Sequence, residues 1–381
     1  MTAHLTAPVG SGRILLGLNT FGDVGVYPDG HPIPHAQVLR QILEQAELAD
    51  AVGLHAFAVG EHHRKDFAVS APETLLAAAA ARTKQILLGS AVTVLSSDDP
   101  IRVFQRFSTV DAVSNGRAEV MLGRGSFVES FPLFGFDLAD YEVLFEEKLD
   151  LFDKVRSQKP VHWEGRTRPA IHGLSVYPPL EHHLLPTWIG VGGTPESVLR
   201  CAHYGYPIIF AIIGGEPAAF APLAGLYRQA MAKYGHPMQQ MATHSPGHVA
   251  ATDEEAREEY FPHWLDLRNR IGAERGWGPA NRREFDAMCA PEGALYVGSP
   301  ETVAQKIALL KRNLGVDRFD LKYSSGSLPH PAMMRSIELF GTVVAPRVAD
   351  LLAGSPHNTN RADQADTLPG IGTSQTRPLA D

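Results

Sequence analysis

The sequence predicts an α/β protein with the (β/α)8 architecture of a TIM barrel. Short apolar runs alternate with stretches of helical periodicity along the chain. Counting them gives eight strand–helix units in one series, a number that favours a closed parallel barrel. The 381 residues, of which 44% are hydrophobic, also suffice for one large core. A doubly wound sheet is the competing architecture, but it does not require eight similar units in series.

Each predicted strand is short and apolar, and each helix carries apolar residues three or four positions apart. In chain order we expect strands at 14–19, 56–59, 86–94, 118–122, 187–191, 207–213, 248–251 and 319–323. We expect helices at 38–52, from 72 onward, and at 100–114, 141–155, 195–203, 217–234, 254–274, 300–314 and 331–352. Proline at the first helical position supports several of these starts, and Asn115-Gly116 ends the third helix.

Three segments lie outside this pattern. Residues 1–12 are expected to form a flexible arm, and the proline-rich stretch 157–186 a small hairpin inserted in the barrel. Residues 354–381 are polar and poor in apolar side chains, which predicts a disordered tail. The sequence therefore predicts a single domain over 13–353.

Composition narrows the functional classes. The formal net charge is −8 without any clustered basic run, so we expect no nucleic-acid partner. We find no run of about 18 apolar residues, so no membrane span is expected. The first residues lack the pattern of a signal peptide. The two cysteines, Cys201 and Cys289, are expected to be reduced and mostly buried, and we expect a cytoplasmic protein.

Glu61-His62-His63 follows a predicted strand, and in a parallel barrel such positions meet at one mouth. One of these imidazoles could serve as a proton donor. Neighbouring residues point in different directions, so we expect at most one histidine to face the site. The three residues lack the spacing typical of zinc hydrolases, and we predict no metal. A structural role in the loop is the alternative interpretation.

Two further motifs indicate an anion site. Gly123-Arg124-Gly125 ends another strand, where a guanidinium fork suits phosphate and glycines allow close approach. The stretch 191–197 ends a strand and opens a helix, so its free N–H groups and hydroxyls form a second anion site, although plain capping by Thr194 explains it equally. Neither a dinucleotide fingerprint nor a P-loop is present. Small residues in 89–95 leave space for a flat ring, or simply pack the barrel interior.

Taken together, these motifs resemble the bacterial luciferase-like flavin monooxygenases. The resemblance runs from about residue 14 to residue 352 and is most specific in 86–136, with further support from 192–197 and 336–340. It implies a luciferase-like (β/α)8 barrel with loop insertions. It also implies that reduced FMN reacts with O2 to give a C4a-hydroperoxide that oxygenates a small organic substrate. A separate NAD(P)H:flavin reductase would supply FMNH2, and relatives are commonly dimers or larger.

The resemblance also implies roles for individual residues. His62 matches the catalytic histidine, and Arg124 the arginine that binds the flavin phosphate. The remaining cofactor-binding positions are Asn19, Ala91, Val92, Gly193, Thr194 and Ser197. Of these, Gly193, Thr194 and Ser197 surround the phosphate, and the Ala91–Val92 bond matches a non-proline cis peptide beneath the flavin ring.

The sequence departs from luciferase at Gly123, where luciferase has a reactive cysteine, and neither light emission nor an aldehyde substrate is expected. Several alternatives stay open. They are an FMN- or F420-dependent dehydrogenase, a non-catalytic flavin-binding protein, and a metal-dependent barrel hydrolase that uses Glu61, His62 and His63.

Overall fold

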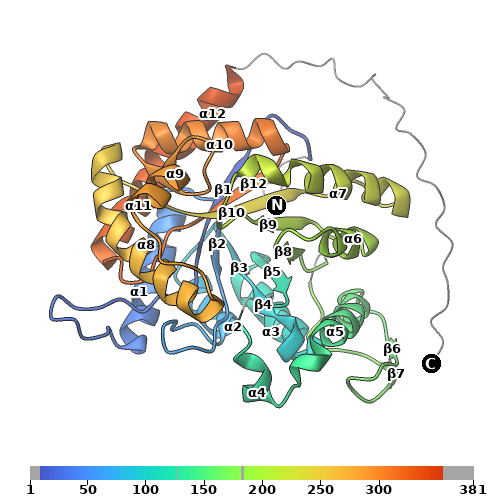
Figure 1. Ribbon diagram of the computed structural model, residues 1–381. Coiled ribbons are helices and arrows are strands. Elements are labelled where there is room, and N and C mark those ends of the chain that lie inside the picture. Colours follow the sequence, from blue (N-terminus) through green and yellow to red (C-terminus); the bar gives the residue numbers. More distant parts are fainter. Residues whose placement is uncertain (1–8, 126, 182–183, 355–381) are drawn as a thin grey trace, which may run out of the picture.

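Eight parallel strands form a closed ring in the computed structural model, which describes residues 9–125, 127–181 and 184–354 (Figure 1). The ring closes because the last strand pairs with both the first and the seventh. A short strand, β11 (Tyr296–Gly298), pairs with the end of β10 outside the ring. In chain order the ring consists of β1 (Leu15–Thr20), β2 (Ala56–Val59), β3 (Leu87–Ser90) with its continuation β4 (Thr93–Val94), β5 (Ala118–Gly123), β8 (Thr187–Val191), β9 (Ile208–Ala211), β10 (Met241–Val249) and β12 (Arg318–Lys322). The predicted (β/α)8 barrel is confirmed.

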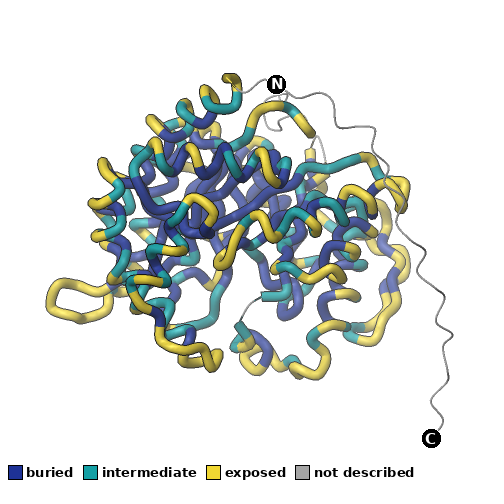
Figure 2. Tube along the Cα trace, turned by 45° about the horizontal axis from the view of Figure 1, so that its top comes forward, coloured by how far each residue is buried: buried dark blue, intermediate teal, exposed yellow. Residues whose placement is uncertain are grey.

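Helices surround the strands, and their apolar faces form the main core (Figure 2). The barrel helices are α1 (His35–Ala51), α2 (Pro72–Ala80), α3 (Pro100–Ser114), α5 (Tyr141–Arg156), α6 (Pro195–His203), α7 (Ala221–Tyr234), α10 (Pro300–Leu314), α11 (His330–Leu339) and α12 (Ala345–Ala353). Side-chain caps fix several starts, since Asp99 accepts from two N–H groups of α3 and Ser299 from one of α10. Asn115, at a φ of 57°, ends α3 as predicted. No described helix combines the length and apolarity that crossing a membrane requires.

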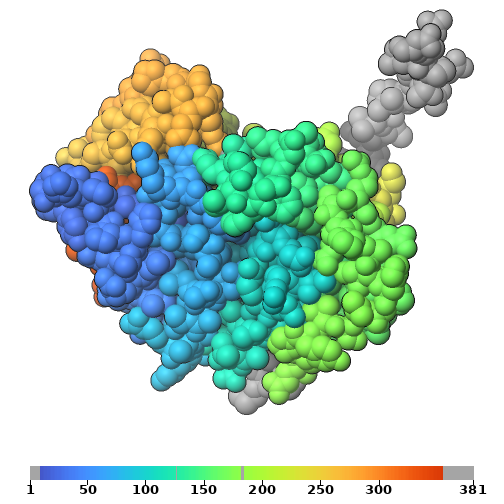
Figure 3. Space-filling model, turned by 90° about the horizontal axis from the view of Figure 1, so that it is seen from below, coloured from blue at the N-terminus to red at the C-terminus, as the bar shows by residue number. Residues whose placement is uncertain are grey.

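Insertions extend this frame. The antiparallel strands β6 (Val161–Trp163) and β7 (Ile171–Leu174) form the predicted hairpin, and α4 (Ser130–Phe134) follows β5. The long helix α8 (Asp253–Arg275) and α9 (Arg282–Cys289) lie between β10 and β11. They have a small apolar core of their own, and they form the light-orange lobe of Figure 3. The predicted tail falls almost wholly in 355–381, outside the described residues.

Three predicted boundaries were wrong. The seventh strand is Met241–Val249 rather than 248–251, because its buried residues Thr243, His244 and Ser245 are polar and hid the apolar pattern. The third strand divides at a cis bond between Ala91 and Val92. The last predicted helix, 331–352, contains a π-helical segment over Phe340–Val344 that separates α11 from α12.

A buried ionic network links three strands at the N-terminal end of the ring. Arg318 on β12 donates to both Glu119 oxygens at 2.7 and 2.9 Å and to Asp320 at 2.7 Å. Trp188 on β8 donates its indole N–H to Glu119 at 3.1 Å. All four side chains are buried, so each charge depends on its partners for solvation. The opposite end of the ring is left open to form the mouth.

Candidate functional site

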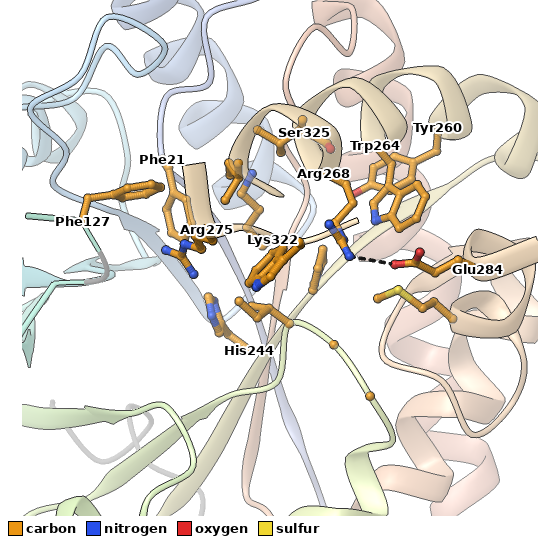
Figure 4. Close-up of a pocket in the computed structure, with 18 of the residues that line it drawn as sticks. Phe21, Phe127, His244, Tyr260, Trp264, Arg268, Arg275, Glu284, Lys322 and Ser325 are labelled. Carbon is orange, nitrogen blue, oxygen red and sulfur yellow. Dashed lines mark ion pairs between the residues drawn. The ribbon is translucent and has the colours of Figure 1, made fainter. Parts of the chain in front are cut away.

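A cavity of about 480 Å³ occupies the C-terminal mouth of the barrel. The ends of β1, β9, β10 and β12 provide one wall, and α8 provides the other (Figure 4). Its rings are those of Phe21, Phe67, Phe127, Tyr260, Trp264 and Trp277. A concave, largely apolar site with a few polar groups is the usual form of a small-molecule site.

His244, on β10, lies in this cavity and contacts Asn19 on β1, the strand on the other side of β12. Asn19 Nδ2 and His244 Nδ1 are 3.0 Å apart, and both residues are buried. Burial, with a contribution from the nearby Lys322 charge, lowers the pKa of His244 to about 4. The ring is therefore neutral near pH 7. His244 was not predicted as a site residue, because the strand was expected to begin only at residue 248. A run of polar residues in a strand that faces the barrel interior is the signal that could have found it.

Lys322, at the end of β12, also faces the cavity but its charge is compensated. Its ammonium lies 3.0 Å from each carboxylate oxygen of Asp23 and donates to the Ser324 carbonyl. Burial alone would raise the pKa of Asp23, but Lys322, Ser324 and the Gly326 N–H together hold it below its usual value. This pair is a fixed, internally neutral element of the cavity wall.

Glu61, His62 and His63 line one small cavity, but His62 has different contacts from the other two. Glu61 accepts from the Val94 N–H and pairs with His63, both at 2.8 Å. His62 instead lies among the rings of Phe21, Phe67 and Phe127, with centroids 4.3–5.5 Å away. Burial lowers the pKa of His62 to about 4. Neither histidine is among the residues that line the large cavity, whereas Phe21, Phe67 and Phe127, which contact His62, all are.

Arg124, Thr194 and Ser197 come together at the edge of the mouth. Arg124 Nη2 donates to Ser197 Oγ at 3.3 Å, and the hydroxyls of Thr194 and Ser197 are 2.7 Å apart. Arg124 also pairs with Glu142 on α5. Thr194 does not cap α6 with its side chain, so the backbone N–H groups of the first turn have no side-chain acceptor. Gly193 has a φ of 118°, a backbone conformation suited to glycine.

The Ala91–Val92 bond is cis, and Val92 packs closely against two glycines. A Cβ on Gly123 would lie 2.7 Å from a Val92 methyl, and one on Gly190 would lie 3.1 Å from another. Glycine at 123, the departure noted in the sequence, is therefore required by the position of Val92. The two cysteines are free and buried, as predicted. Over the described residues, no group of three or more His, Cys, Asp or Glu side chains is placed to hold a metal ion.

The family model described as luciferase-like monooxygenase matches residues 16–318. The chain belongs to this family. A curated relative, the 4-hydroxyprotoasukamycin monooxygenase of Streptomyces nodosus subsp. asukaensis, is 27% identical over 329 residues, which cover 82% of this chain and 87% of that protein. This luciferase-like protein is accordingly an enzyme of the oxidoreductase class.

Solved structures share the fold with either of two cofactors. The oxygenating constituent of the 3,6-diketocamphane monooxygenase of Pseudomonas putida, in complex with FMN, has a TM-score of 0.71 at 20% identity, covering 88% of this chain and 99% of its own. An F420-dependent secondary alcohol dehydrogenase has a TM-score of 0.68 at 17% identity, with the same coverage. These likenesses establish the luciferase-like barrel.

Proposed function

We propose that this luciferase-like enzyme binds reduced FMN and uses it with O2 to oxygenate a small organic substrate. A separate NAD(P)H:flavin reductase delivers the reduced flavin. The observation that carries the proposal is the cluster of Arg124, Thr194 and Ser197 beside the cavity. Family membership and the FMN complex of one structural relative support the same cofactor.

The chemistry of this cluster fits an FMN phosphate. Arg124 offers a guanidinium fork, the two hydroxyls offer hydrogen bonds, and the start of α6 offers N–H groups without a side-chain cap. Gly193 keeps the backbone free of a side chain at the same edge. The cis bond at Ala91–Val92, with Asn19 nearer the axis of the barrel, would then support the ring of the flavin.

Bound reduced flavin would activate O2, and the chain would supply the cavity wall and the side chains that hold a proton. The rings of Phe21, Phe67 and Phe127 make their side of the mouth apolar, which would disfavour water beside a bound substrate. Two neutral imidazoles, His62 behind that wall and His244 inside the cavity, can each hold or pass a proton there.

A flavin titration followed by exposure to air tests the proposal. The full-length protein should bind anaerobically reduced FMN. On mixing with O2, return of the oxidised-flavin spectrum should be slower than for free reduced FMN, with hydrogen peroxide release delayed in step. Reoxidation at the rate of free flavin, despite binding, would favour the dehydrogenase or storage alternatives. Preferential binding of F420 would show that F420, and not FMN, is the cofactor.

The same assay tests His62 as the proton donor. His62→Ala should leave FMN affinity unchanged but slow substrate oxygenation by about 10²–10⁴-fold, since general acid–base groups contribute that much. His244→Ala is the matched comparison, because His244 also has a lowered pKa but lies inside the cavity. Full activity in the His62 variant would remove that residue from the mechanism.

A further inference from the structure

Among the described residues, the barrel strands bring to the cavity one side chain whose hydrogen-bond donor has no acceptor. We propose that the substrate of this enzyme is a flat, largely apolar molecule with an uncharged carbonyl oxygen, and that His244 donates its Nε2–H to that oxygen. The proposal rests on the proposed function, because it names the substrate class of the same site and the residue that selects it.

Asn19 determines which nitrogen of His244 carries the proton. Asn19 Nδ2 lies 3.0 Å from His244 Nδ1, and Asn19 is completely buried. The amide N–H donates in this orientation, so Nδ1 accepts and the proton of the neutral ring lies on Nε2. The atom left without a partner is then Asn19 Oδ1. The opposite orientation would instead deprive the buried NH2 group of this acceptor, and buried donors without a partner are rarer than buried carbonyl oxygens without one.

The other nitrogen of His244, Nε2, is open to the cavity. His244 lies on the strand side of the cavity, opposite α8 (Figure 4). The neighbouring hydroxyls of Thr243 and Ser245 are unpaired and fully enclosed, whereas Nε2 has no described partner and keeps accessible surface. Burial and the nearby Lys322 charge lower the pKa of His244 to about 4. The ring therefore presents a neutral N–H donor near pH 7.

The charged side chains of the cavity have partners of their own. Lys322 Nζ contacts three oxygen atoms, two of them on Asp23, and an ammonium group has three donors. Arg268 pairs with Glu284 at 3.3 Å, and Arg275 also has a partner. A carboxylate would lose its hydration here without gaining a free counter-charge, whereas an uncharged carbonyl oxygen needs only a hydrogen bond. The cavity therefore favours an uncharged acceptor.

Aromatic rings define the body of the substrate. The ring centre of Phe21 lies 6.2 Å from that of His244, and Trp264 and Trp277 line the side formed by α8 and the residues after it. Aromatic side chains favour a flat, apolar partner that can stack or meet them edge to face. The volume of about 480 Å³ is within the range of sites for drug-sized molecules.

His244 lies across the ring of strands from the cis bond between Ala91 and Val92. Three strands separate β10 from β3 in one direction, namely β12, β1 and β2, and three in the other, namely β9, β8 and β5. Ala91 and Val92, which directly follow β3, are not among the residues that line the cavity. His244 is therefore placed to contact a substrate rather than the cofactor.

Two isosteric probes isolate this hydrogen bond. They are 2-acetonaphthone and 2-isopropenylnaphthalene, which differ by the exchange of the carbonyl oxygen for a methylene group. Equilibrium dialysis against the full-length protein, first without and then with FMN, measures both dissociation constants. His244→Leu should weaken binding of the ketone about fivefold or more and that of the alkene about twofold or less. His244→Gln, which keeps an N–H donor near the position of Nε2, should retain ketone binding within about threefold.

The matched control is His248→Gln. His248 is also buried on β10, but it pairs with Glu259 at 2.8 Å and is not among the residues that line the cavity. This variant should alter the binding of neither probe. A third probe, 2-naphthoate, tests the charge of the acceptor, and it should bind the wild-type protein less tightly than the ketone does.

Several outcomes would overturn the proposal. They are equal losses for ketone and alkene in His244→Leu, no loss for the ketone, no binding of either probe to the wild-type protein, or tighter binding of 2-naphthoate than of the ketone. An effect of His244 that disappears once FMN is bound would also overturn it, because the nitrogen would then contact the cofactor. If His244→Leu does not fold, the ¹⁵N resonance of His244 Nε2 in the wild-type protein replaces it. That resonance should shift with the ketone and not with the alkene, and an unchanged resonance would count against the proposal.

The two proposals can fail separately. The first dialysis experiments contain neither flavin nor O2, so a failed flavin test leaves their result readable. Loss of the ketone preference alongside a successful flavin test would reject the substrate class alone.

Discussion

At the scale of single residues, Arg124 is expected to contribute most of the affinity of the proposed phosphate site. Arg124 directly follows β5, and no other cation contacts the Ser197 hydroxyl among the described hydrogen bonds. Arg124→Ala should remove a charge-assisted contact worth roughly 1.5–3 kcal/mol and weaken FMN binding about 10- to 150-fold. Quenching of flavin fluorescence on titration with protein would measure the change.

A matched variant makes this result specific. Arg200, on α6, pairs with the same Glu142 and with Glu146, both on α5, and has no described hydrogen bond to Thr194 or Ser197. Arg200→Ala should therefore affect FMN affinity far less than Arg124→Ala. Equal losses in the two variants would indicate a general electrostatic effect and contradict a specific role for Arg124.

At the scale of elements, Arg64 links the end of α8 to the loop after β2, and Arg270 of α8 adds a longer pair with Asp66 at 3.7 Å. Arg64, in the loop after β2, donates to both oxygens of Glu274 at 2.9 and 2.6 Å, and it also pairs with Asp66 and Glu129. Arg64→Ala should free the last turns of α8, because helix ends open when their tertiary contacts are lost. Hydrogen exchange of the amides in 266–275 should then accelerate several-fold.

The control for this prediction is Arg347→Ala, which removes a comparable exposed pair with Glu301 between α12 and α10. That variant should leave exchange in α8 unchanged. Unaltered exchange in the Arg64 variant would show that the apolar contacts of Tyr260 and Trp264, with the Arg270–Asp66 pair, hold the helix without Arg64.

Some helices and strands could be predicted from the sequence, and others could not. Most barrel strands and helices were predictable, because their apolar residues repeat with periods of two or 3.6. Arg124, Thr194 and Ser197 lie together, as the family resemblance implied, and their role in phosphate binding stays a prediction. β10 was misplaced because buried polar residues broke its pattern, and His244 was lost with it. The face of α8 that lines the cavity was equally hidden, since charged residues interrupt its apolar pattern and only the folded structure reveals which face covers the mouth.

At the scale of the whole molecule, buried histidines make stability depend on pH. Burial lowers the pKa of His62 and His244 to about 4, and burial with the Arg318 charge lowers that of His55 to about 3. In the unfolded chain these groups titrate near 6.5. Below that pH these histidines take up protons in the unfolded state but not in the folded state. The free energy of unfolding therefore falls as the pH falls from about 6.5 toward 4.

The melting temperature should accordingly decline between about pH 7 and about pH 5, with each histidine costing about 2 kcal/mol at the lower limit. Thermal unfolding followed by circular dichroism across this range would measure the decline. His62→Gln should make it shallower, because one titrating group is removed. A melting temperature that does not change over this range would contradict the lowered pKa values.

The contact between Arg124 and Glu142 would affect how the cofactor binds and how it is released. In the proposed phosphate site, Glu142 would act as an internal substitute for the phosphate, since it already pairs with the same guanidinium. A phosphate that binds would have to compete with this carboxylate, and Arg124 would be paired again once the phosphate left. Both effects would reduce the net affinity for the cofactor. Under the proposed function, a reduced net affinity suits a flavin that the enzyme receives from a reductase and releases after every turnover.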